Sequence, residues 1–160
     1  MHAPVIDLTP DLLLAVHALN QRFATELSST TEAELATLIG AAAYARGIGR
    51  LNGFLMAFDQ TAKIEGPNYA WFKARYGHFL YVDRIAVADA AQGRGVAHRL
   101  YTDLIAWAQS RGHPMLACEV NVRPPNPASD ALHASLGFRE ITQRELPNGK
   151  RVRYLIKDLG

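Results

Sequence analysis

The chain has 160 residues, of which 49% are hydrophobic and 20% charged, a balance typical of one globular domain with a sizeable core. A net charge of +2, with no run of five like charges, excludes the basic surface that nucleic acid requires. The single cysteine excludes an intramolecular disulfide. No apolar run reaches the roughly 18 residues of a membrane span, and the N-terminus lacks a signal-peptide pattern. We therefore predict one domain over residues 1–160, in the cytoplasm, with no membrane or nucleic-acid partner.

The first half of the chain is predicted to hold helices around a strand pair. Thr9 and Pro10 are typical of a helix start, and Thr31 with Glu34 forms the pattern of a capping box. Residues 41–44 either end the second helix or begin a strand. The expected order is an edge strand at 5–8, a helix from 9 to a polar break at 28–31, a helix from 31, strands at 42–48 and 51–58, a loop at 59–67 and an aromatic-rich helix at 68–76.

The second half is organised around a strand, a glycine-bearing turn and a helix, at 79–87, 88–94 and 95–111. Val96, Leu100 and Leu104 share one face of that helix. A buried strand at 115–120 follows, and this order predicts a parallel crossover. We expect the remaining elements to be a stiff proline-rich connection at 123–127, a short helix at 128–136 and a hairpin of strands 138–146 and 150–157 around Asn148-Gly149.

A strand that enters a helix through glycines makes an anion-binding site. The first N–H groups of the helix have no intrahelical partner, and the helix dipole adds partial positive charge there. Gly93 and Gly95 lack a Cβ, so a phosphate can approach the backbone. The turn is neither a P-loop nor a dinucleotide-binding fingerprint, because Val96 and His98 stand where those motifs need other residues.

The turn resembles a signature of the GNAT family of N-acetyltransferases. Residues 92–97 read Gln-Gly-Arg-Gly-Val-Ala and are similar to the family's Q/R-x-x-G-x-G/A sequence, which cradles the pyrophosphate of coenzyme A. A second segment supports the resemblance, because Asn126 is followed at the family's spacing by Ser129, His133 and Gly137-Phe138. The family usually has Tyr where this chain has His133. The two segments lie in the last half of the chain.

The resemblance implies an α+β fold: a single mixed, mostly antiparallel sheet, splayed between its two central parallel strands and flanked by helices. It implies acetyl-CoA as the co-substrate, bound in the gap between those strands. The backbone of the strand end would pair with pantetheine, and the turn would hold the phosphates. The cofactor-binding residues that this resemblance and the turn chemistry predict are Ile85, Ala86, Val87, Gln92, Gly93, Arg94, Gly95, Val96, Ala97, His98 and Asn126.

Some of these side chains are equally suited to roles without a cofactor. Arg94, His98 and Arg99 can contact phosphates or simply lie in solvent. Asn126, followed by Pro127, is also a good helix N-cap.

Three side chains are candidates for catalysis. His133 stands at the position of the family's general acid, and a neutral imidazole still has one N–H to donate to a leaving thiolate; the alternative is a buried histidine bonded to the backbone. Asp83 and Glu119 lie on the two strands that flank the gap, where a carboxylate can act as a general base. Alternatively each forms a structural ion pair, Asp83 with a nearby arginine and Glu119 with Arg123.

Aromatic residues are candidates for the acceptor pocket. Tyr81 has the same strand parity as Asp83, so both can face one site. Tyr69, Phe72 and Tyr76 share one helical face and are expected to fill the core, whereas Trp71 lies off that face and is the candidate to wall the pocket.

Cysteine and metal chemistry are not expected. Cys118 lies in an apolar strand and is expected to be inert packing rather than a nucleophile. The histidines show no paired metal-ligand spacing, so no metal is predicted.

The sequence therefore predicts an N-acetyltransferase that moves the acetyl group of acetyl-CoA to an amine by direct attack in a ternary complex. The alternative is a non-catalytic domain that binds and senses acyl-CoA. A small-molecule amine is the favoured acceptor, with a peptide or protein amine as the other option. The strands near Phe138 and Val152 are candidates for pairing in a homodimer.

Overall fold

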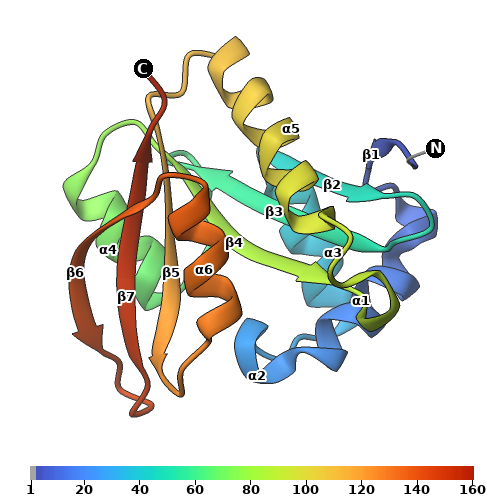
Figure 1. The fold of residues 1–160 in the computed structure, drawn as a ribbon, viewed down its shortest axis with the longest axis horizontal. Helices are drawn as coiled ribbons and strands as arrows, with labels where there is room; N and C mark the ends of the chain where they lie inside the picture. The colour runs from blue at the N-terminus through green and yellow to red at the C-terminus, as the bar shows by residue number, and fades with distance from the viewer. Residues whose placement is uncertain (1–2) are drawn as a thin grey trace.

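A computed structural model describes residues 3–160 and contains one sheet with helices on both faces (Figure 1). Within those residues the sheet has seven strands in the order β1-β2-β3-β4-β5-β7-β6. The strands are β1 (Val5–Asp7), β2 (Tyr44–Ile48), β3 (Gly53–Asp59), β4 (Leu80–Val87), β5 (Met115–Arg123), β6 (Arg139–Glu145) and β7 (Arg151–Asp158). The helices are α1 (Leu13–Arg22), α2 (Ala24–Leu27), α3 (Glu32–Ala41), α4 (Pro67–Arg75), α5 (Val96–Ser110) and α6 (Pro127–Ser135), with short 3-10 turns η1 (Pro10–Leu12) and η2 (Asp89–Ala91).

The two central strands, β4 and β5, are parallel, and the other neighbouring strands pair antiparallel. β4 and β5 pair at only two positions, Leu80 with Leu116 and Tyr81 with Ala117. Beyond Tyr81 the strands separate, and Figure 1 shows their carboxyl ends pointing apart. The predicted α+β fold with a sheet splayed between its central parallel strands is confirmed.

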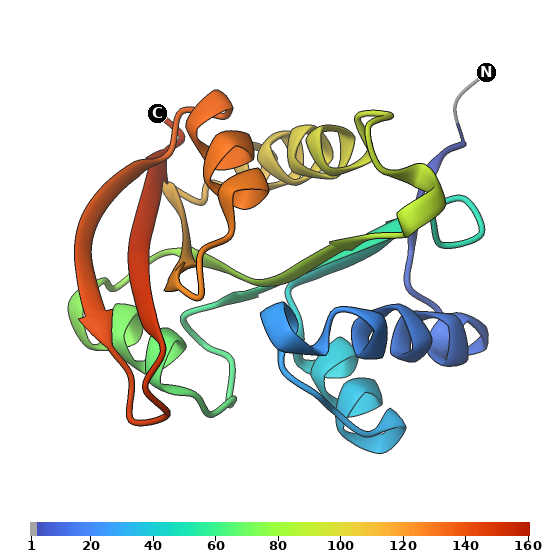
Figure 2. The same cartoon turned by 60° about the horizontal axis from the view of Figure 1, so that its bottom comes forward.

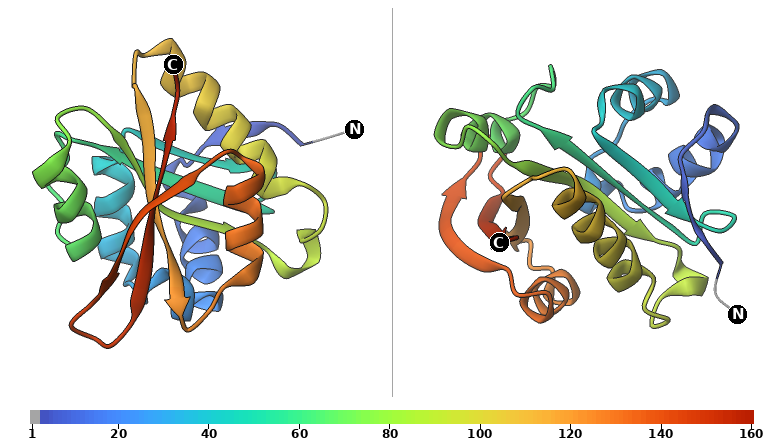
Figure 3. Two further views of the ribbon diagram at one scale, coloured as in Figure 1. Left: turned by 60° about the vertical axis from the view of Figure 1, so that its left-hand side comes forward. Right: turned by 90° about the horizontal axis from the view of Figure 1, so that it is seen from above.

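The helices form two layers, one on each face of the sheet. Figures 2 and 3 show α5 and α6 on one face and α1, α2 and α3 on the other. Successive residues of β3 enter different cores: Phe54 and Met56 pack with α1, α3 and α4, whereas Leu55 and Ala57 pack with α5. Because β3 is covered on both faces, its sequence is apolar nearly throughout, whereas β4 carries Asp83 and Arg84 in its middle.

Local sequence signals explain most element boundaries. Thr31 and Glu34 form the predicted capping box at the start of α3, with both bonds at 3.1 Å. α3 ends at Ala41, so the strand pair is formed as expected. The first predicted helix is interrupted instead: Thr9 makes no side-chain cap, η1 precedes α1, and α1 ends at Arg22, with one residue between it and the short α2. This interruption brings α2 beside the opening between β4 and β5 (Figure 1).

Gly53 at the start of β3 permits an unusually close approach of three elements. A Cβ at this position would lie 2.8 Å from the carbonyl oxygen of Ala86 on β4 and 2.8 Å from Cγ1 of Val96 on α5. Real Cβ atoms essentially never make contacts this short. The absence of a side chain at Gly53 therefore lets the first turn of α5 rest directly on the sheet.

No helix among residues 3–160 combines the length and the hydrophobicity that a bilayer crossing needs. The same part of the chain holds no cluster of three or more His, Cys, Asp or Glu side chains that could coordinate a metal ion.

Candidate active site

A cavity of about 530 Å³ occupies the opening between β4 and β5. Its walls come from the carboxyl ends of these strands, the turn before α5, the inner faces of α5 and α6, and α2. This volume lies in the range of about 300–1,000 Å³ that is typical of sites for small ligands. The splay of the sheet therefore creates a ligand-sized space bordered by both central strands.

The glycine turn borders one end of the cavity. Gly93 and Gly95 have φ of 78° and 75°, in the left-handed region that favours glycine, and a Cβ built on either would meet no atom within 4 Å. Gly95 is the N-cap of α5 and offers no side-chain cap, so the first amides of the helix keep their donors for a ligand. This cradle fits a pyrophosphate, whose oxygens accept such donors.

Several predicted phosphate-site side chains surround this turn. Gln92, Val96, Ala97 and His98 contribute to the cavity wall, and the side-chain amide of Gln92 donates to the carbonyl oxygen of Val87 at 3.3 Å. Arg94 is exposed and does not line the cavity that the described residues form.

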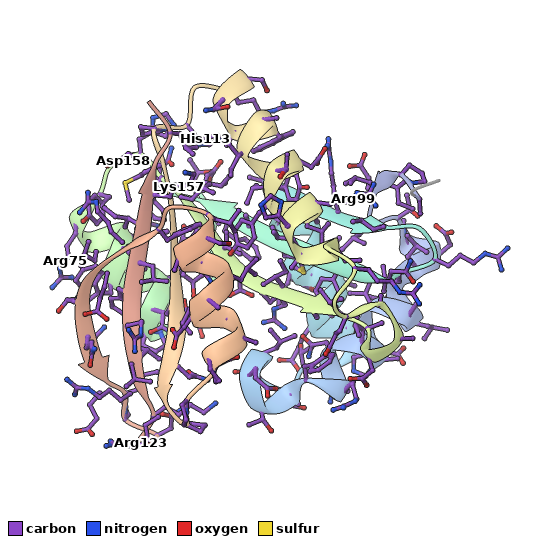
Figure 4. The ribbon with its side chains drawn as sticks, in the orientation of Figure 1. Arg75, Arg99, His113, Arg123, Lys157 and Asp158 are labelled. Atoms are coloured by element: carbon purple, nitrogen blue, oxygen red, sulfur yellow. The ribbon has the colours of Figure 1, made fainter. Side chains whose placement is uncertain are left out.

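Arg99 points elsewhere. Its guanidinium donates to the carbonyl oxygen of Ala3 at 2.6 Å, between α5 and the N-terminal segment (Figure 4).

The end of β4 forms one long wall of the cavity. Ile85, Ala86 and Val87 all line it. These residues pair with β3 on one side, but β4 has no pairing with β5 after Tyr81. Peptide groups on the open side of β4 can therefore hydrogen-bond an extended ligand as an added strand would.

Glu119 on β5 lines the cavity opposite this wall. It is partly buried, and the Tyr81 hydroxyl donates to its Oε2 at 2.6 Å. Burial raises the pKa of Glu119 to about 7, although the Tyr81 hydrogen bond acts in the opposite direction. A carboxylate with a pKa near neutrality can both accept and release a proton under physiological conditions. The predicted alternative, an ion pair with Arg123, is wrong: Arg123 at the tip of the sheet pairs with Glu145 instead (Figure 4), because residues four apart on a strand lie roughly 13 Å apart.

Asp83 lies in a structural ion pair. Its Oδ2 accepts a hydrogen bond of 2.7 Å from Nε of Arg84, as the structural alternative predicted. The Arg84 side chain is only 10% exposed and also donates to Oδ1 of Asn20 on α1 at 2.8 Å. Asp83 also lines the cavity, but its carboxylate is engaged in this network.

His133 on α6 is buried, with 3% of its surface exposed. Its Nδ1 lies 2.7 Å from the carbonyl oxygen of Ser129, and its Nε2 lies 2.6 Å from the hydroxyl of Tyr101 on α5. Burial lowers the pKa of His133, so the neutral imidazole predominates at pH 7. A carbonyl oxygen can only accept, so Nδ1 carries the hydrogen and Nε2 accepts from Tyr101.

Of the remaining predicted site residues, Asn126 lines the cavity, whereas Trp71 and Tyr81 do not. Asn126 is the N-cap of α6, accepting from the amide of Ser129 at 3.3 Å, and it also lines the cavity. Trp71 lies on the far side of the sheet. The centre of its ring is 4.7 Å from that of Tyr154, and the guanidinium carbon of Arg75 lies 4.1 Å from the centre of the Trp71 ring. Figure 4 shows Arg75 on α4, away from the opening. The cavity wall within residues 3–160 includes neither Trp71 nor Tyr81.

Two further wall residues complete the site. Cys118 is buried, and burial raises the pKa of its thiol, so it stays protonated and unreactive. Tyr101 lines the cavity and was not singled out from the sequence, where it only follows Leu100 on the predicted helix. The signal that could have found it is its hydroxyl, because a buried phenol needs a hydrogen-bond partner.

Together these features bring an anion cradle, an open strand edge and a carboxylate of raised pKa into one cavity. Residues 38–138 match the model of the acetyltransferase (GNAT) family. The chain belongs to this family, as the sequence motifs predicted.

Two curated relatives match part of the chain. L-2,4-diaminobutyric acid acetyltransferase of Wolinella succinogenes is 27% identical over 82 residues, which are 51% of this chain and 47% of the relative. The [ribosomal protein bS18]-alanine N-acetyltransferase of Haemophilus ducreyi is 38% identical over 79 residues, 47% of this chain and 53% of the relative. The chain thus spans about half the length of these relatives.

Solved structures match over nearly the whole chain. The ribosomal-protein-S18-alanine N-acetyltransferase of Escherichia coli has a TM-score of 0.74 at 21% identity, covering 98% of this chain and 94% of that one. Ard1 of Thermoplasma volcanium has a TM-score of 0.79 at 12% identity, covering 99% and 98%. Arabidopsis thaliana NAA60, solved with acetyl-CoA, has a TM-score of 0.75 at 12% identity, covering 97% of each. The TM-scores establish a shared fold, and at such low identities they establish the fold alone.

Proposed function

We propose that this protein is an N-acetyltransferase that moves the acetyl group of acetyl-CoA to an amine by direct attack in a ternary complex. One observation carries the proposal: a single cavity joins the glycine cradle before α5 to the carboxylate of Glu119, whose pKa is raised to about 7. The cradle suits a pyrophosphate, and the carboxylate suits the removal of a proton from an ammonium group.

The acetyl-CoA molecule would lie along β4. The backbone amides between Gly93 and Ala97 receive its pyrophosphate, with Gln92 and His98 at the rim. The open edge of Ile85–Val87 pairs with the pantetheine arm, and Asn126 borders the same passage. This placement brings the thioester towards Glu119, and a backbone N–H near Val87 polarises its carbonyl.

Glu119 is the proposed general base. It takes a proton from the acceptor ammonium, directly or through water, and the free amine then attacks the thioester carbon. A positioned base contributes roughly 10²–10⁴-fold to the rate, and holding both substrates in one cavity supplies much of the remainder. Asp83 borders the same space but stays paired with Arg84.

The acceptor is proposed to be a small primary amine that enters beside α2. Glu26, Asp83 and Glu119 all line the cavity, and this excess of carboxylates favours a positively charged acceptor. The relatives act, by their names, on diaminobutyric acid and on a ribosomal-protein alanine, so a peptide N-terminus is the competing acceptor. We also propose a cytoplasmic location, and a homodimer that forms through the edge strand β6, since β7 is paired on both sides.

Two measurements test the proposal. Titration calorimetry with acetyl-CoA should show saturable binding, and thiol release should then be followed with L-2,4-diaminobutyric acid and, separately, with a peptide that begins with alanine. Turnover with an amine supports the transferase. Binding without turnover of any amine would favour the sensing domain instead, an alternative that rests on His133 standing in place of the family's tyrosine. If folded protein does not bind acetyl-CoA, both the transferase and the sensing domain are excluded.

A further inference from the structure

Tyr101 is a buried phenol on the inner wall of the proposed acetyl-CoA cavity. It lies on α5 six residues after Gly95, which places it about 9 Å further along the helix axis. Its side chain is 0% exposed and borders the cavity, and its hydroxyl lies 2.6 Å from Nε2 of His133. α5 and α6 thus bring one phenol and one imidazole together on the same wall.

The hydrogen-bond pattern leaves His133 without a free N–H. Its Nδ1 hydrogen is directed to the carbonyl oxygen of Ser129 at 2.7 Å, while the Ser129 hydroxyl lies further away at 3.3 Å. Its Nε2 accepts from Tyr101. The neutral imidazole therefore has no proton to give to a leaving group, and the hydroxyl of Tyr101 is the transferable hydrogen of this pair.

We propose that Tyr101 donates the proton to the sulfur that leaves acetyl-CoA, and that His133 is the positioning residue that holds the phenol. This inference rests on the proposed function. It replaces the sequence-based expectation that His133 itself donates.

The proton balance closes. The acceptor ammonium gives one proton to Glu119, and its nitrogen forms the new bond to the acetyl carbon. The carbon–sulfur bond breaks, its electron pair goes to sulfur, and the Tyr101 hydroxyl proton moves to that sulfur. The new amide nitrogen loses a second proton, which returns through water to the Tyr101 oxygen. Glu119 releases its proton to solvent, so the products are an amide, a free thiol and one proton.

The direction of the hydroxyl can change during the reaction. A hydroxyl hydrogen rotates to its best acceptor, and a bond to an anion is roughly twice as strong as a bond to a neutral nitrogen. Negative charge that develops on sulfur therefore draws the hydrogen away from Nε2. Burial raises the pKa of Tyr101, so the phenol stays protonated.

Packing fixes the phenol in place. The rings of Tyr101, His133 and Phe138 form a triangle with centre distances of 5.3, 5.7 and 5.1 Å, all near edge-to-face. Tyr81, another buried phenol nearby, is bonded to Glu119 and lies outside the cavity wall of the described residues. Tyr101 is therefore the phenol that the cavity presents on this side.

The first test is Tyr101→Phe, assayed by thiol release from acetyl-CoA with the amine that wild type turns over. We expect kcat to fall about 10²-fold, with the Kd for acetyl-CoA unchanged by calorimetry. Tyr44→Phe is the matched control, because Tyr44 is also buried and its hydroxyl donates to Asp103 at 2.7 Å, away from the cavity. This control should lose stability but keep its kcat.

Two variants separate positioning from donation. His133→Gln keeps an acceptor for the Tyr101 hydroxyl and should retain most of the activity, whereas His133→Leu should lower kcat less than Tyr101→Phe does. If His133 donates instead, both variants lose activity and Tyr101→Phe keeps it, which overturns the proposal. In wild type, ¹⁵N NMR should find the hydrogen of His133 on Nδ1; a hydrogen on Nε2 contradicts the inference.

A fluorinated tyrosine at position 101 covers the case in which Tyr101→Phe does not fold. The fluorinated phenol keeps its shape and is more acidic, so kcat should change while the Kd for acetyl-CoA stays the same. An unchanged kcat overturns the proposal. A wild type that binds acetyl-CoA but acetylates no amine overturns this inference together with the proposed function, whereas full activity of Tyr101→Phe overturns this inference alone.

Discussion

The hydroxyl of Tyr81 on β4 donates to Oε2 of Glu119 on β5 across 2.6 Å, just beyond the last paired position of the two strands. The bond crosses the point at which the sheet opens. Burial raises the pKa of Tyr81 far above its usual range, so the phenol remains a donor and Glu119 remains the acceptor. The position of the carboxylate is thus set by the strand that also carries the proposed acetyl-CoA wall.

Glu119→Gln should reduce kcat/KM by at least 10²-fold, because the amide cannot take a proton from the acceptor. Since the pKa of Glu119 is raised to about 7, the carboxylate is protonated below that pH, and wild-type kcat/KM should rise with pH through about 7. The variant should lose this rise but bind acetyl-CoA normally. Kinetics from pH 5 to 9, with calorimetry of both proteins, check this; an unchanged rise in the variant assigns the base elsewhere.

Tyr81→Phe should move the same rise to higher pH. The hydroxyl stabilises the charged form of Glu119 and so lowers its pKa against the effect of burial. Without that donor the carboxylate is harder to ionise, and activity at neutral pH falls while activity at alkaline pH recovers. The pH profile of the variant is the measurement. A profile that keeps its midpoint would show that the bond does not control the ionisation of Glu119.

Gly95→Val should weaken the binding of acetyl-CoA at least tenfold. The side chain would enter the open space of the cradle, where the phosphates are proposed to lie. Gly112→Val is the matched control, since Gly112 has the same φ of 75° and equally open surroundings but lies at the other end of α5. In both variants a valine must adopt a left-handed backbone conformation, which lowers the stability of the fold by about 1–2 kcal/mol. Calorimetry should find lost affinity in Gly95→Val alone, and equal losses would refute the cradle.

Arg84→Ala should destabilise the fold by about 3 kcal/mol, because it removes the cation that pairs with the partly buried carboxylate of Asp83 and the donor to the buried side-chain oxygen of Asn20. Arg22→Ala is the comparison: its ion pair with Asp89 is 60% and 57% exposed, and such pairs contribute less than about 1 kcal/mol. Urea denaturation of both variants measures the difference. Equal small losses would show that the Arg84 network adds little to stability.

Much of the fold could be predicted because its signals are local. The capping box at Thr31, the hairpin around Asn148-Gly149 and the strand–turn–helix around Gly93 each depend on neighbouring residues, and the structure forms all three. The family resemblance then supplied the splay of the sheet between its two central parallel strands. The interruption at Phe23 could not be foreseen, because residues 12–27 contain neither glycine nor proline and so give no local signal for the end of α1.

The site was harder to predict than the fold, because its contacts join distant residues. The bond between Tyr101 and His133 spans 32 positions, and that between Tyr81 and Glu119 spans 38. The sequence pattern places Tyr101 after Leu100 on the predicted helix but gives no information about which partner its hydroxyl meets. Likewise, Trp71 lies off the helical face that the other aromatic residues of α4 share, which predicted a place in the acceptor pocket. In the structure it packs on Tyr154 instead.

Gly53 places a constraint on this site that no ligand contact would reveal. It is distant from Val96 in the sequence, and it faces the sheet and the helix rather than the cavity, yet the closeness of α5 to β4 depends on its missing side chain. A methyl group there would act as a wedge under the first turn of the helix and tilt its amides away from the strand edge. The distance between the proposed phosphate site on α5 and the proposed pantetheine site on β4 therefore depends in part on Gly53, a residue outside the cavity wall.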